Sequence, residues 1–368
     1  MAAVLVSTTL TGSNADIIGP ALRSVVPYVD LCLVIDTGAT DDTMRVAADV
    51  AGEKFRAATF TWCNDFAAAR NFALEQAAAL GATWAVTVDT DERIITDREG
   101  AWKELDRFPD GVGEVRAYDK MATYSKERFI RLPAGGHWGW ATHECFVRNE
   151  GVWAEGITGI RFDELSKTKE QYQHKLDRDK TILEAMAEAD PSDGRCAYYL
   201  GQTYHSLNEN ELAAAAYRRS APLIEWDEQA GFAMFRAAEC LYAVGRNQEG
   251  FDAAVEGLRY SSRIPELAWM AALTSYQLGN MLTAVGWAHM SIAIGESDGA
   301  GAHLQRSHLR DLLGVHDGPW DVLRFAYRAL GDNAEAAKAE KRYEAAKARR
   351  EAQQGLIRPS APGRGAKW

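Results

Sequence analysis

The feature that most constrains the fold lies in the first ninety residues, where short apolar runs alternate with amphipathic stretches. The apolar runs occupy residues 4–8, 31–36, 56–62 and 84–89. The amphipathic stretches between them occupy residues 15–26, 41–52 and 65–81. Continuous apolar strands separated by amphipathic helices are typical of a parallel sheet that is covered on both faces. The sequence therefore predicts an α/β domain with a mostly parallel sheet.

Polar or small residues close three of the predicted strands. These clusters are Ser7-Thr8-Thr9, Asp36-Thr37-Gly38 and Asp89-Thr90-Asp91. In open α/β sheets, ligands bind outside the carboxyl ends of the strands. We therefore expect the three clusters to share one edge of the sheet and to form a ligand site there.

The third cluster concentrates acidic side chains directly after a buried strand. Asp89 and Asp91 alternate along the chain, so their side chains are expected to point the same way. Mg²⁺ and Mn²⁺ prefer a few carboxylates, with water and phosphate oxygens in the remaining positions. A divalent metal site is one interpretation of the cluster. The other is a solvated turn at a strand end, because D-x-D also occurs by chance.

A basic residue follows within the predicted helix "NDFAAARNFALEQAAALG". Asp65 is its expected N-cap, which places Arg70 within the second turn. A guanidinium near a helix N-terminus adds to the attraction of the helix for a phosphate. The alternative partner for Arg70 is an Asp of the adjacent turn.

The character of the chain changes after the middle. Residues 100–165 are less regular, and from about residue 170 the pattern predicts helices almost throughout. Segments 198–221, 235–258 and 269–292 match one another at spacings of 37 and 34 residues, which superposes Asn208, Gly245 and Gly279 in their turns. This period is close to that of tetratricopeptide repeats and favours a short helical solenoid over an ordinary helical bundle.

Charge and composition limit the classes of function. A net charge of −11 disfavours general binding to nucleic acids, and five scattered cysteines without a C-x-x-C pair disfavour a disulfide framework or a structural zinc site. No apolar run is long enough to span a membrane, and "MAAVLVSTTL" lacks the positive start of a signal peptide, so a cytoplasmic location is expected. Residues 337–368 hold nine basic and three acidic side chains, which predicts a solvated basic helix and a frayed tail.

Four segments in order carry a family resemblance: "VDLCLVIDTGATDDT", "NDFAAARNFALEQA", "WAVTVDTDE" and "RFIRLPAGGHWGWATHECF". Together they resemble glycosyltransferase family 2, in a subgroup that joins a GT-A domain to tetratricopeptide-like helices. The resemblance covers roughly the first 150 residues. It implies a GT-A (Rossmann-like), mostly parallel α/β domain at 1–165. The repeat and the composition of the chain's end then predict an all-α tetratricopeptide-like domain at 170–332 and a basic helix with a flexible tail at 333–368.

The resemblance also implies a role for individual residues. The residues that would contact the nucleotide-sugar are Thr8, Asp36, Arg70, Asp89 and Trp140. Ligands for Mn²⁺ or Mg²⁺ would be Asp91, Asp89 and His143. Glu144 would be the general base that deprotonates the acceptor, with His143 beside it and Asp163 and Glu164 as further candidates.

These roles imply an inverting, metal-dependent glycosyltransferase that uses a nucleotide-sugar, with UDP the expected nucleotide. The helices suggest a protein or peptide acceptor and a homodimer. The chain departs from the family where "K-N-E" is common, because Gly12-Ser13-Asn14 stands there. Two alternatives are a nucleotidyltransferase, disfavoured because no Gly-rich phosphate loop with a Lys follows the first strand, and a non-catalytic helical-repeat adaptor with a degenerate glycosyltransferase domain.

Overall fold

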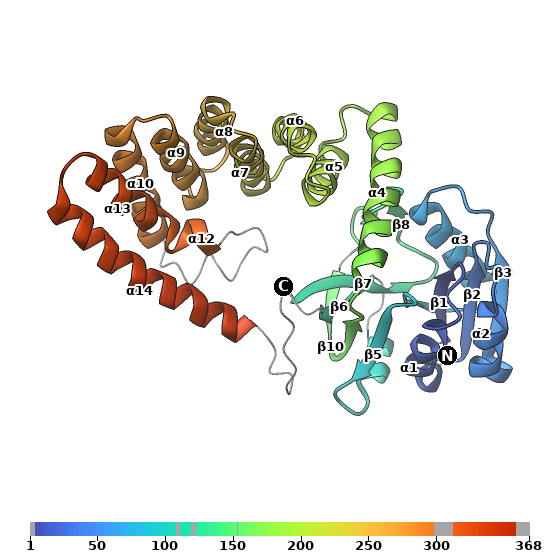
Figure 1. The fold of residues 1–368 in the computed structure, drawn as a ribbon. Helices are drawn as coiled ribbons and strands as arrows, with labels where there is room; N and C mark the ends of the chain where they lie inside the picture. The colour runs from blue at the N-terminus through green and yellow to red at the C-terminus, as the bar shows by residue number, and fades with distance from the viewer. Residues whose placement is uncertain (1–3, 108–110, 119–122, 153, 298–311, 358–368) are drawn as a thin grey trace. The chain divides into compact units, whose positions relative to one another are not determined.

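The computed structural model describes residues 4–107, 111–118, 123–152, 154–297 and 312–357 (Figure 1). The chain divides into two compact units, Met1–Tyr172 and Gln173–Trp368, which we call the α/β unit and the helical unit. Each is described by itself. Among the helices in the described ranges, none combines the length and the apolar character needed to cross a membrane.

The α/β unit is built on an eight-stranded mixed sheet with the order β3-β2-β1-β4-β7-β6-β10-β5. Its strands are β1 (Leu5–Thr11), β2 (Leu31–Asp36), β3 (Phe55–Thr59), β4 (Trp84–Thr87), β5 (Glu92–Thr96), β6 (Val112–Tyr118), β7 (Thr123–Arg131) and β10 (Ala154–Glu164). Strands β1 to β4 pair in parallel, whereas β7 runs antiparallel to both β4 and β6. A separate hairpin joins β8 (Gly136–Gly139) to β9 (Cys145–Arg148). The predicted α/β class is therefore confirmed, with a sheet that is mixed beyond β4.

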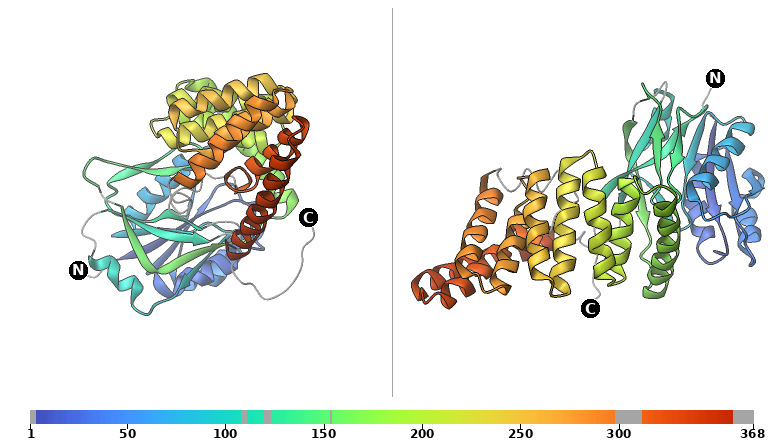
Figure 2. Two further views of the ribbon diagram at one scale, coloured as in Figure 1. Left: turned by 90° about the vertical axis from the view of Figure 1, so that its left-hand side faces the viewer. Right: turned by 90° about the horizontal axis from the view of Figure 1, so that it is seen from above.

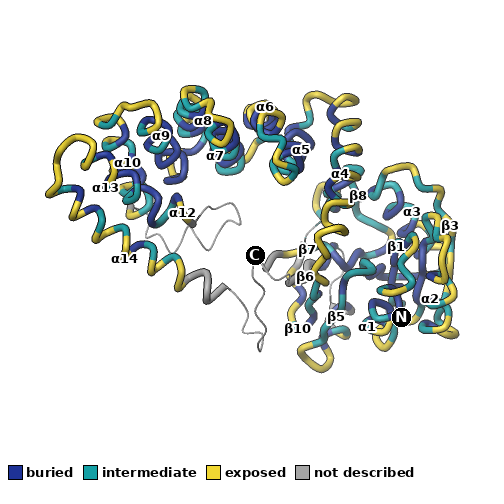
Figure 3. The backbone as a smooth tube through the Cα atoms, viewed as in Figure 1, coloured by how far each residue is buried: buried dark blue, intermediate teal, exposed yellow. Residues whose placement is uncertain are grey.

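Helices cover both faces of the parallel part of this sheet, as the apolar runs predict. Val34 of β2 packs with Ile18 and Ala47, which belong to α1 (Ile18–Val25) and α2 (Thr43–Ala51). Its neighbour Leu33 clusters instead with Leu74 of α3 (Phe66–Ala79). Successive side chains of a strand point to opposite faces, so one apolar run supplies two cores. Figure 3 shows β1 and β2 as mostly buried and β3 as more exposed.

One strand is longer than the sequence predicts. β1 continues to Thr11, whereas its polar end was expected at residues 7–9. Thr8 lies inside the strand, buried and aligned with Thr87, and Thr11 is aligned with Asp36. Because β2 offers backbone partners as far as Asp36, β1 keeps pairing past its run of hydroxyl side chains.

The helical unit consists of successive helix pairs, seen side by side in Figure 2. Its described helices are α4 (Lys169–Ala189), α5 (Gly194–Ser206), α6 (Asn210–Ser220), α7 (Asp227–Ala243), α8 (Asn247–Tyr260), α9 (Pro265–Gln277), α10 (Met281–Ser297), α12 (Leu312–Val315), α13 (Gly318–Ala329) and α14 (Asn333–Ile357). Each helix from α5 to α10 packs against the next one along the chain. The predicted helical solenoid of tetratricopeptide-like repeats is confirmed.

The turns between paired helices share one backbone conformation. Asn208, Gly245 and Gly279, which the repeat superposes, have φ angles of 60°, 76° and 79°. This left-handed region is one that glycine and asparagine adopt most readily, so the repeat preserves a helix C-terminal turn. Gly331 has the same conformation between α13 and α14, with φ of 82°. The structure thus adds a fourth helix pair that the sequence comparison missed.

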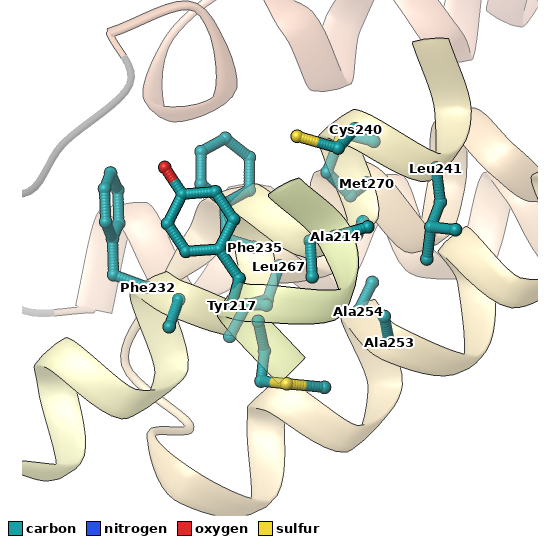
Figure 4. Packing of buried hydrophobic residues seen from close by; sticks show 14 of the residues in the cluster. Ala214, Tyr217, Phe232, Phe235, Cys240, Leu241, Ala253, Ala254, Leu267 and Met270 are labelled. Atoms are coloured by element: carbon teal, nitrogen blue, oxygen red, sulfur yellow. The ribbon is translucent and has the colours of Figure 1, made fainter. Parts of the chain in front are cut away.

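Small residues let the paired helices approach closely, and Figure 4 shows the resulting core around Tyr217, Ala254 and Phe235. A Cβ placed on Gly201 would lie 2.7 Å from Cδ1 of Tyr217. Ala238 and Ala272, at the equivalent repeat positions, are fully buried. The repeat therefore keeps a small side chain at the position where its two helices meet.

The basic helix at the end of the chain differs from its prediction. α14 is not solvated all round, because Ala336, Ala339 and Ala346 are buried on one face and α14 packs against α13. Arg350 also pairs with the buried carboxylate of Asp317, at an Nε–Oδ1 distance of 2.7 Å. The helix therefore belongs to the helical unit, and the predicted frayed tail lies outside the described residues from 358 onward.

Candidate functional site

Asp89, two residues beyond β4, lies at the centre of a group of charged side chains. Its Oδ1 accepts a hydrogen bond from Nη2 of Arg70 and its Oδ2 accepts one from Nη2 of Arg128, both at 2.8 Å. Arg70 also donates from Nε to Oε1 of Glu144 at 2.7 Å. Arg70 thus joins a carboxylate that follows the central sheet to one in the loop before β9.

A second part of the network lies deeper in the sheet. Glu92 begins β5 with a fully buried side chain, and its Oε1 accepts from Arg128 at 2.5 Å and from Lys126 at 3.0 Å. Lys126 also pairs with Glu164, the last residue of β10. The ion pairs therefore form one continuous chain, Glu144–Arg70–Asp89–Arg128–Glu92–Lys126–Glu164.

Helix α3 positions the first members of this network. Asp65 caps the helix, as predicted, with its Oδ1 accepting from the backbone N of Ala68 at 2.8 Å. In the second turn, Asn71 exchanges two hydrogen bonds with the backbone of Trp138, at 2.9 and 2.8 Å. The guanidinium of Arg70 lies over the Trp138 ring, 5.2 Å from its centre. The β8–β9 hairpin is therefore fixed against α3, which brings Glu144 to Arg70.

The ionisation of Asp89 follows from its partners. Burial alone raises the pKa of a carboxyl group, but Arg70, Arg128 and Lys126 outweigh burial and hold the pKa of Asp89 well below its ordinary value. Asp89 is therefore a stable carboxylate at neutral pH. A carboxylate bound by two arginines is a poor proton acceptor.

Hydrogen bonds within the acidic turn 89–92 also stabilise it. The backbone N of Asp89 donates to Oε2 of Glu92 at 3.0 Å, and the backbone N of Glu92 donates to the carbonyl of Asp89 at 3.0 Å. Asp91 faces outward, where its carboxylate pairs with Lys167. Each of the three acids Asp89, Asp91 and Glu92 is therefore paired with a cation of this chain.

A divalent metal does not fit the predicted donors in this arrangement. Both oxygens of Asp89 already accept from arginines, and Asp91 is paired with Lys167. Across the described ranges, no three His, Cys, Asp or Glu side chains gather as a metal site. Metal binding by Asp89, Asp91 and His143 stays a prediction, and it requires Lys167 to leave Asp91.

The remaining predicted ligand residues belong to β2 and to the loop between β8 and β9. Asp36 ends β2, and its Oδ1 accepts from the backbone N of Gly38 and Ala39 at 2.8 and 2.7 Å. Trp140 and His143 lie between β8 and β9 with positive φ angles of 65° and 51°. Their roles as ligand contacts stay predictions.

The three candidate bases are all engaged by cations. Glu144 accepts from Arg70, Asp163 pairs with Arg161, and Glu164 pairs with Lys126. In this arrangement each carboxylate and its cation stabilise one another electrostatically.

Sequence reasoning missed the basic side chains of β7. Lys126 and Arg128 alternate within "SKERFIR", so they point to the same face of the strand. The signal available in the sequence was the pair of cations at alternate positions of one strand. The fold then brings this strand close to the acidic turn. Lys167 carried no comparable signal, because it follows the last strand in an exposed connecting segment.

A second candidate site lies on the helical unit. The repeat spacing aligns residues of α5, α7 and α9 into three columns: Tyr199, Arg236 and Met270; Gln202, Glu239 and Leu273; and His205, Tyr242 and Tyr276. All of these except the buried Met270 are partly exposed. We call these nine residues the repeat face.

Interactions link neighbouring helices along the repeat face. Glu239 and Arg236 of α7 act electrostatically on His205 of α5, and Gln277 of α9 donates to the hydroxyl of Tyr242 at 3.4 Å. Beneath it, the Phe235 and Trp269 rings lie 6.4 Å apart. The repeat face thus crosses three helices and mixes aromatic, amide and charged side chains.

Comparison with known proteins agrees with a tetratricopeptide-like helical domain. A TPR repeat-containing protein of Synechococcus elongatus is 41% identical over 92 residues, which cover 25% of this chain and 21% of that relative. The chain therefore matches about a fifth of the length of this curated relative. No family model matches.

Solved structures overlap weakly. A crystal structure of MamA is 15% identical with a TM-score of 0.38, over 52% of this chain and 99% of that chain. The Cut9–Hcn1 hetero-tetramer of the APC/C is 14% identical with a TM-score of 0.35, over 50% of this chain and 33% of that chain. These overlaps are too low to carry an argument about this chain.

The comparison corrects the prediction of an enzyme. A glycosyltransferase was expected, but the curated relative is named for TPR repeats, and no glycosyltransferase model matches the chain. The prediction rested on four short motifs in the α/β unit. Four acidic residues of the last two motifs, Asp89, Asp91, Glu92 and Glu144, are held in ion pairs, which gives them a structural use that a motif alone does not reveal.

Proposed function

We propose that the protein is a non-catalytic adaptor whose helical repeats bind a segment of another protein. The observation that carries this proposal is the alignment of partly exposed side chains in columns across α5, α7 and α9. Stacked helix pairs create extended surfaces of this kind, and extended chains bind along them. The similarity to a TPR repeat-containing protein supports the same class of function.

The chemistry of the repeat face suits a peptide of mixed character. Tyr242 and Tyr276 offer large apolar surfaces with a polar tip, and Gln202 offers both a donor and an acceptor. Arg236 lies over the Phe232 and Phe235 rings, at 5.0 and 5.3 Å from their centres, which holds its guanidinium in place. Such groups can bind backbone amides and apolar side chains together.

For the α/β unit we propose a degenerate GT-A-like domain that serves as the structural base of the adaptor. Its parallel strands β1 to β4 and the charged edge beyond them support this proposal. Binding of a nucleotide-sugar or UDP near Asp36, without turnover, is the finer hypothesis. A thermal-shift measurement with UDP, with and without Mn²⁺, tests it directly.

The adaptor proposal is tested by selecting peptides from a displayed random library on the full chain. The test variant combines Gln202→Ala and Tyr276→Ala on the repeat face. Its matched control combines Gln248→Ala and Tyr260→Ala on α8, outside the three columns. Truncating two interface residues typically costs more than about 1 kcal/mol each when they carry binding, so affinity should fall about tenfold or more.

Selected peptides should lose affinity for the face variant and keep it for the control. Equal affinity for both variants, or no enrichment of any peptide, would overturn the proposal. Light scattering on the same three proteins tests the expected homodimer, because a dimer through the repeat face should dissociate only in the face variant.

A further inference from the structure

The segment that leads out of the α/β unit is bound to the acidic turn beyond β4. The backbone N of Leu165 donates to the carbonyl of Asp91 at 2.8 Å. Two residues later, the ammonium of Lys167 pairs with the carboxylate of the same Asp91. One residue of the turn therefore holds two points of the connecting segment 165–168, which precedes α4.

The turn itself is firmly anchored. Glu92, its last residue, has a fully buried side chain that pairs with Arg128, whose own side chain is only 5% exposed. Arg93 donates from Nη1 to the carbonyl of Thr90 at 2.9 Å. Asp91 thus projects from a rigid support toward a segment whose own residues are exposed.

The outer ion pair lacks a nearly buried member, whereas five of the six inner pairs contain a side chain that is at most 8% exposed. The side chains of Lys167 and Asp91 are 33% and 29% exposed. Salt screens exposed charges strongly and buried charges much less. The inner network should therefore resist salt, whereas the outer pair should weaken.

We propose that the Asp91–Lys167 ion pair is a salt-sensitive latch that fastens the connecting segment to the α/β unit. With the latch closed, residues 165–168 are held at both the backbone and the side chain. With the latch open, the Leu165 hydrogen bond loses its support, and the segment before α4 gains freedom while Glu164 stays bound to Lys126. This property is independent of the adaptor proposal, because it concerns a contact within the α/β unit alone.

Millisecond hydrogen exchange of the Leu165 amide in the full chain tests the latch. An exposed ion pair contributes about 0.2–1 kcal/mol, which corresponds to a roughly 1.4- to fivefold change in opening. The Leu165 amide of the wild-type protein should exchange faster by this factor when salt rises from about 0.01 M to about 1 M. Lys167→Met should exchange at the faster rate already at low salt and should respond little to added salt.

Lys169→Met is the matched control, because it removes the same charge two residues away. It should behave as the wild-type protein does. The Glu92 amide, which is bonded inside the anchored turn, should be insensitive to salt in all three proteins. A wild-type rate in Lys167→Met, an equal acceleration in Lys169→Met, or an undiminished salt response in Lys167→Met would each overturn the proposal.

Discussion

The two units of this chain are stabilised by different kinds of interaction. The α/β unit places a chain of seven alternating acids and bases at one edge of its sheet, in which Glu92 is fully buried and Arg70 and Arg128 are nearly so. The helical unit relies on small residues and rings at repeated positions, with a core made mostly of Ala, Leu and aromatic side chains. Buried charges depend on every partner being present, whereas apolar packing is spread over many small contacts.

Because of this difference, the two units should be destabilised by different kinds of substitution. Removing one member of the charge network takes a partner away from a buried charge, and the cost is concentrated at that point. Enlarging one small residue between helices disturbs a single helix pair, because each pair contacts mainly its neighbours. The predictions below compare these two responses, from the largest effect to the smallest.

Arg128→Met should produce the largest loss of stability. It leaves the fully buried Glu92 and the carboxylate of Asp89 without their shared partner. Breaking a buried ion pair from one side costs about 3–5 kcal/mol. Chemical denaturation monitored by hydrogen exchange in the α/β unit measures this loss.

Two further variants serve as controls for the effect of Arg128→Met. Arg45→Met removes an exposed cation that pairs with Asp42 and Asp49, and it should cost at most about 1 kcal/mol. Adding Glu92→Gln to Arg128→Met should recover part of the loss, because it removes the buried charge that has lost its arginine partner. Equal effects of Arg128→Met and Arg45→Met would contradict a buried network.

Gly201→Val should destabilise the helical unit by a smaller amount. Its side chain would meet the Tyr217 ring, whose Cδ1 already lies 2.7 Å from an ideal Cβ. Overpacking a core costs about 1–3 kcal/mol. Urea unfolding followed by helix signal measures it, and hydrogen exchange should place the damage mainly in α5 and α6.

Gly286→Ala provides the opposite case in the same unit. A Cβ at Gly286 in α10 meets no heavy atom within 4 Å, so alanine should gain about 0.5–1 kcal/mol through helix propensity. A loss of stability in both glycine variants would show that close packing does not explain the repeat.

Lowering the pH should affect the two units in different ranges. The pKa of Asp89 is depressed, so its contribution to stability is complete above the ordinary Asp value of about 3.9 and is lost as the pH falls below it. Burial lowers the pKa of His205, so unfolding takes up a proton below its ordinary value of about 6.5. The helical unit should therefore begin to lose stability at the higher pH.

Urea titrations from pH 7 to about pH 3, read separately for each unit by hydrogen exchange, follow both groups. Asp89→Asn should approach the stability of the wild-type protein only below about pH 4, and His205→Gln should remove the dependence near pH 6. A stability difference between Asp89→Asn and wild type that stays constant over the whole range would contradict the depressed pKa.

The smallest expected effect concerns the predicted metal. Because Lys167 pairs with Asp91, Mn²⁺ can reach that carboxylate only by displacing it, and Lys167→Met should bind Mn²⁺ up to about fivefold more tightly than wild type. Electron paramagnetic resonance of free Mn²⁺ measures both affinities. If neither protein bound Mn²⁺ in a saturable way, the prediction of a metal site would be wrong.

The sequence predicted the architecture better than the candidate site. Apolar runs and repeated turn residues such as Gly245 follow local rules of strand alternation and helix termination, so the helices, parallel strands and repeats could be predicted. The charge network could not, because Glu92, Arg128 and Glu164 are distant in sequence and meet only through the strand order of the sheet. The acids at the end of β4 were visible, but the identity of their counter-ions was not.

The successive stacking of α5 to α10 also has a mechanical consequence. A chain pulled from its end loses contacts one helix pair at a time, because each pair contacts mainly its neighbours. The sheet of the α/β unit, where β1 is enclosed between β2 and β4, must instead break several strand pairings together. Under tension the helical unit would therefore lengthen gradually, as a spring does, while the α/β unit would yield in a single event.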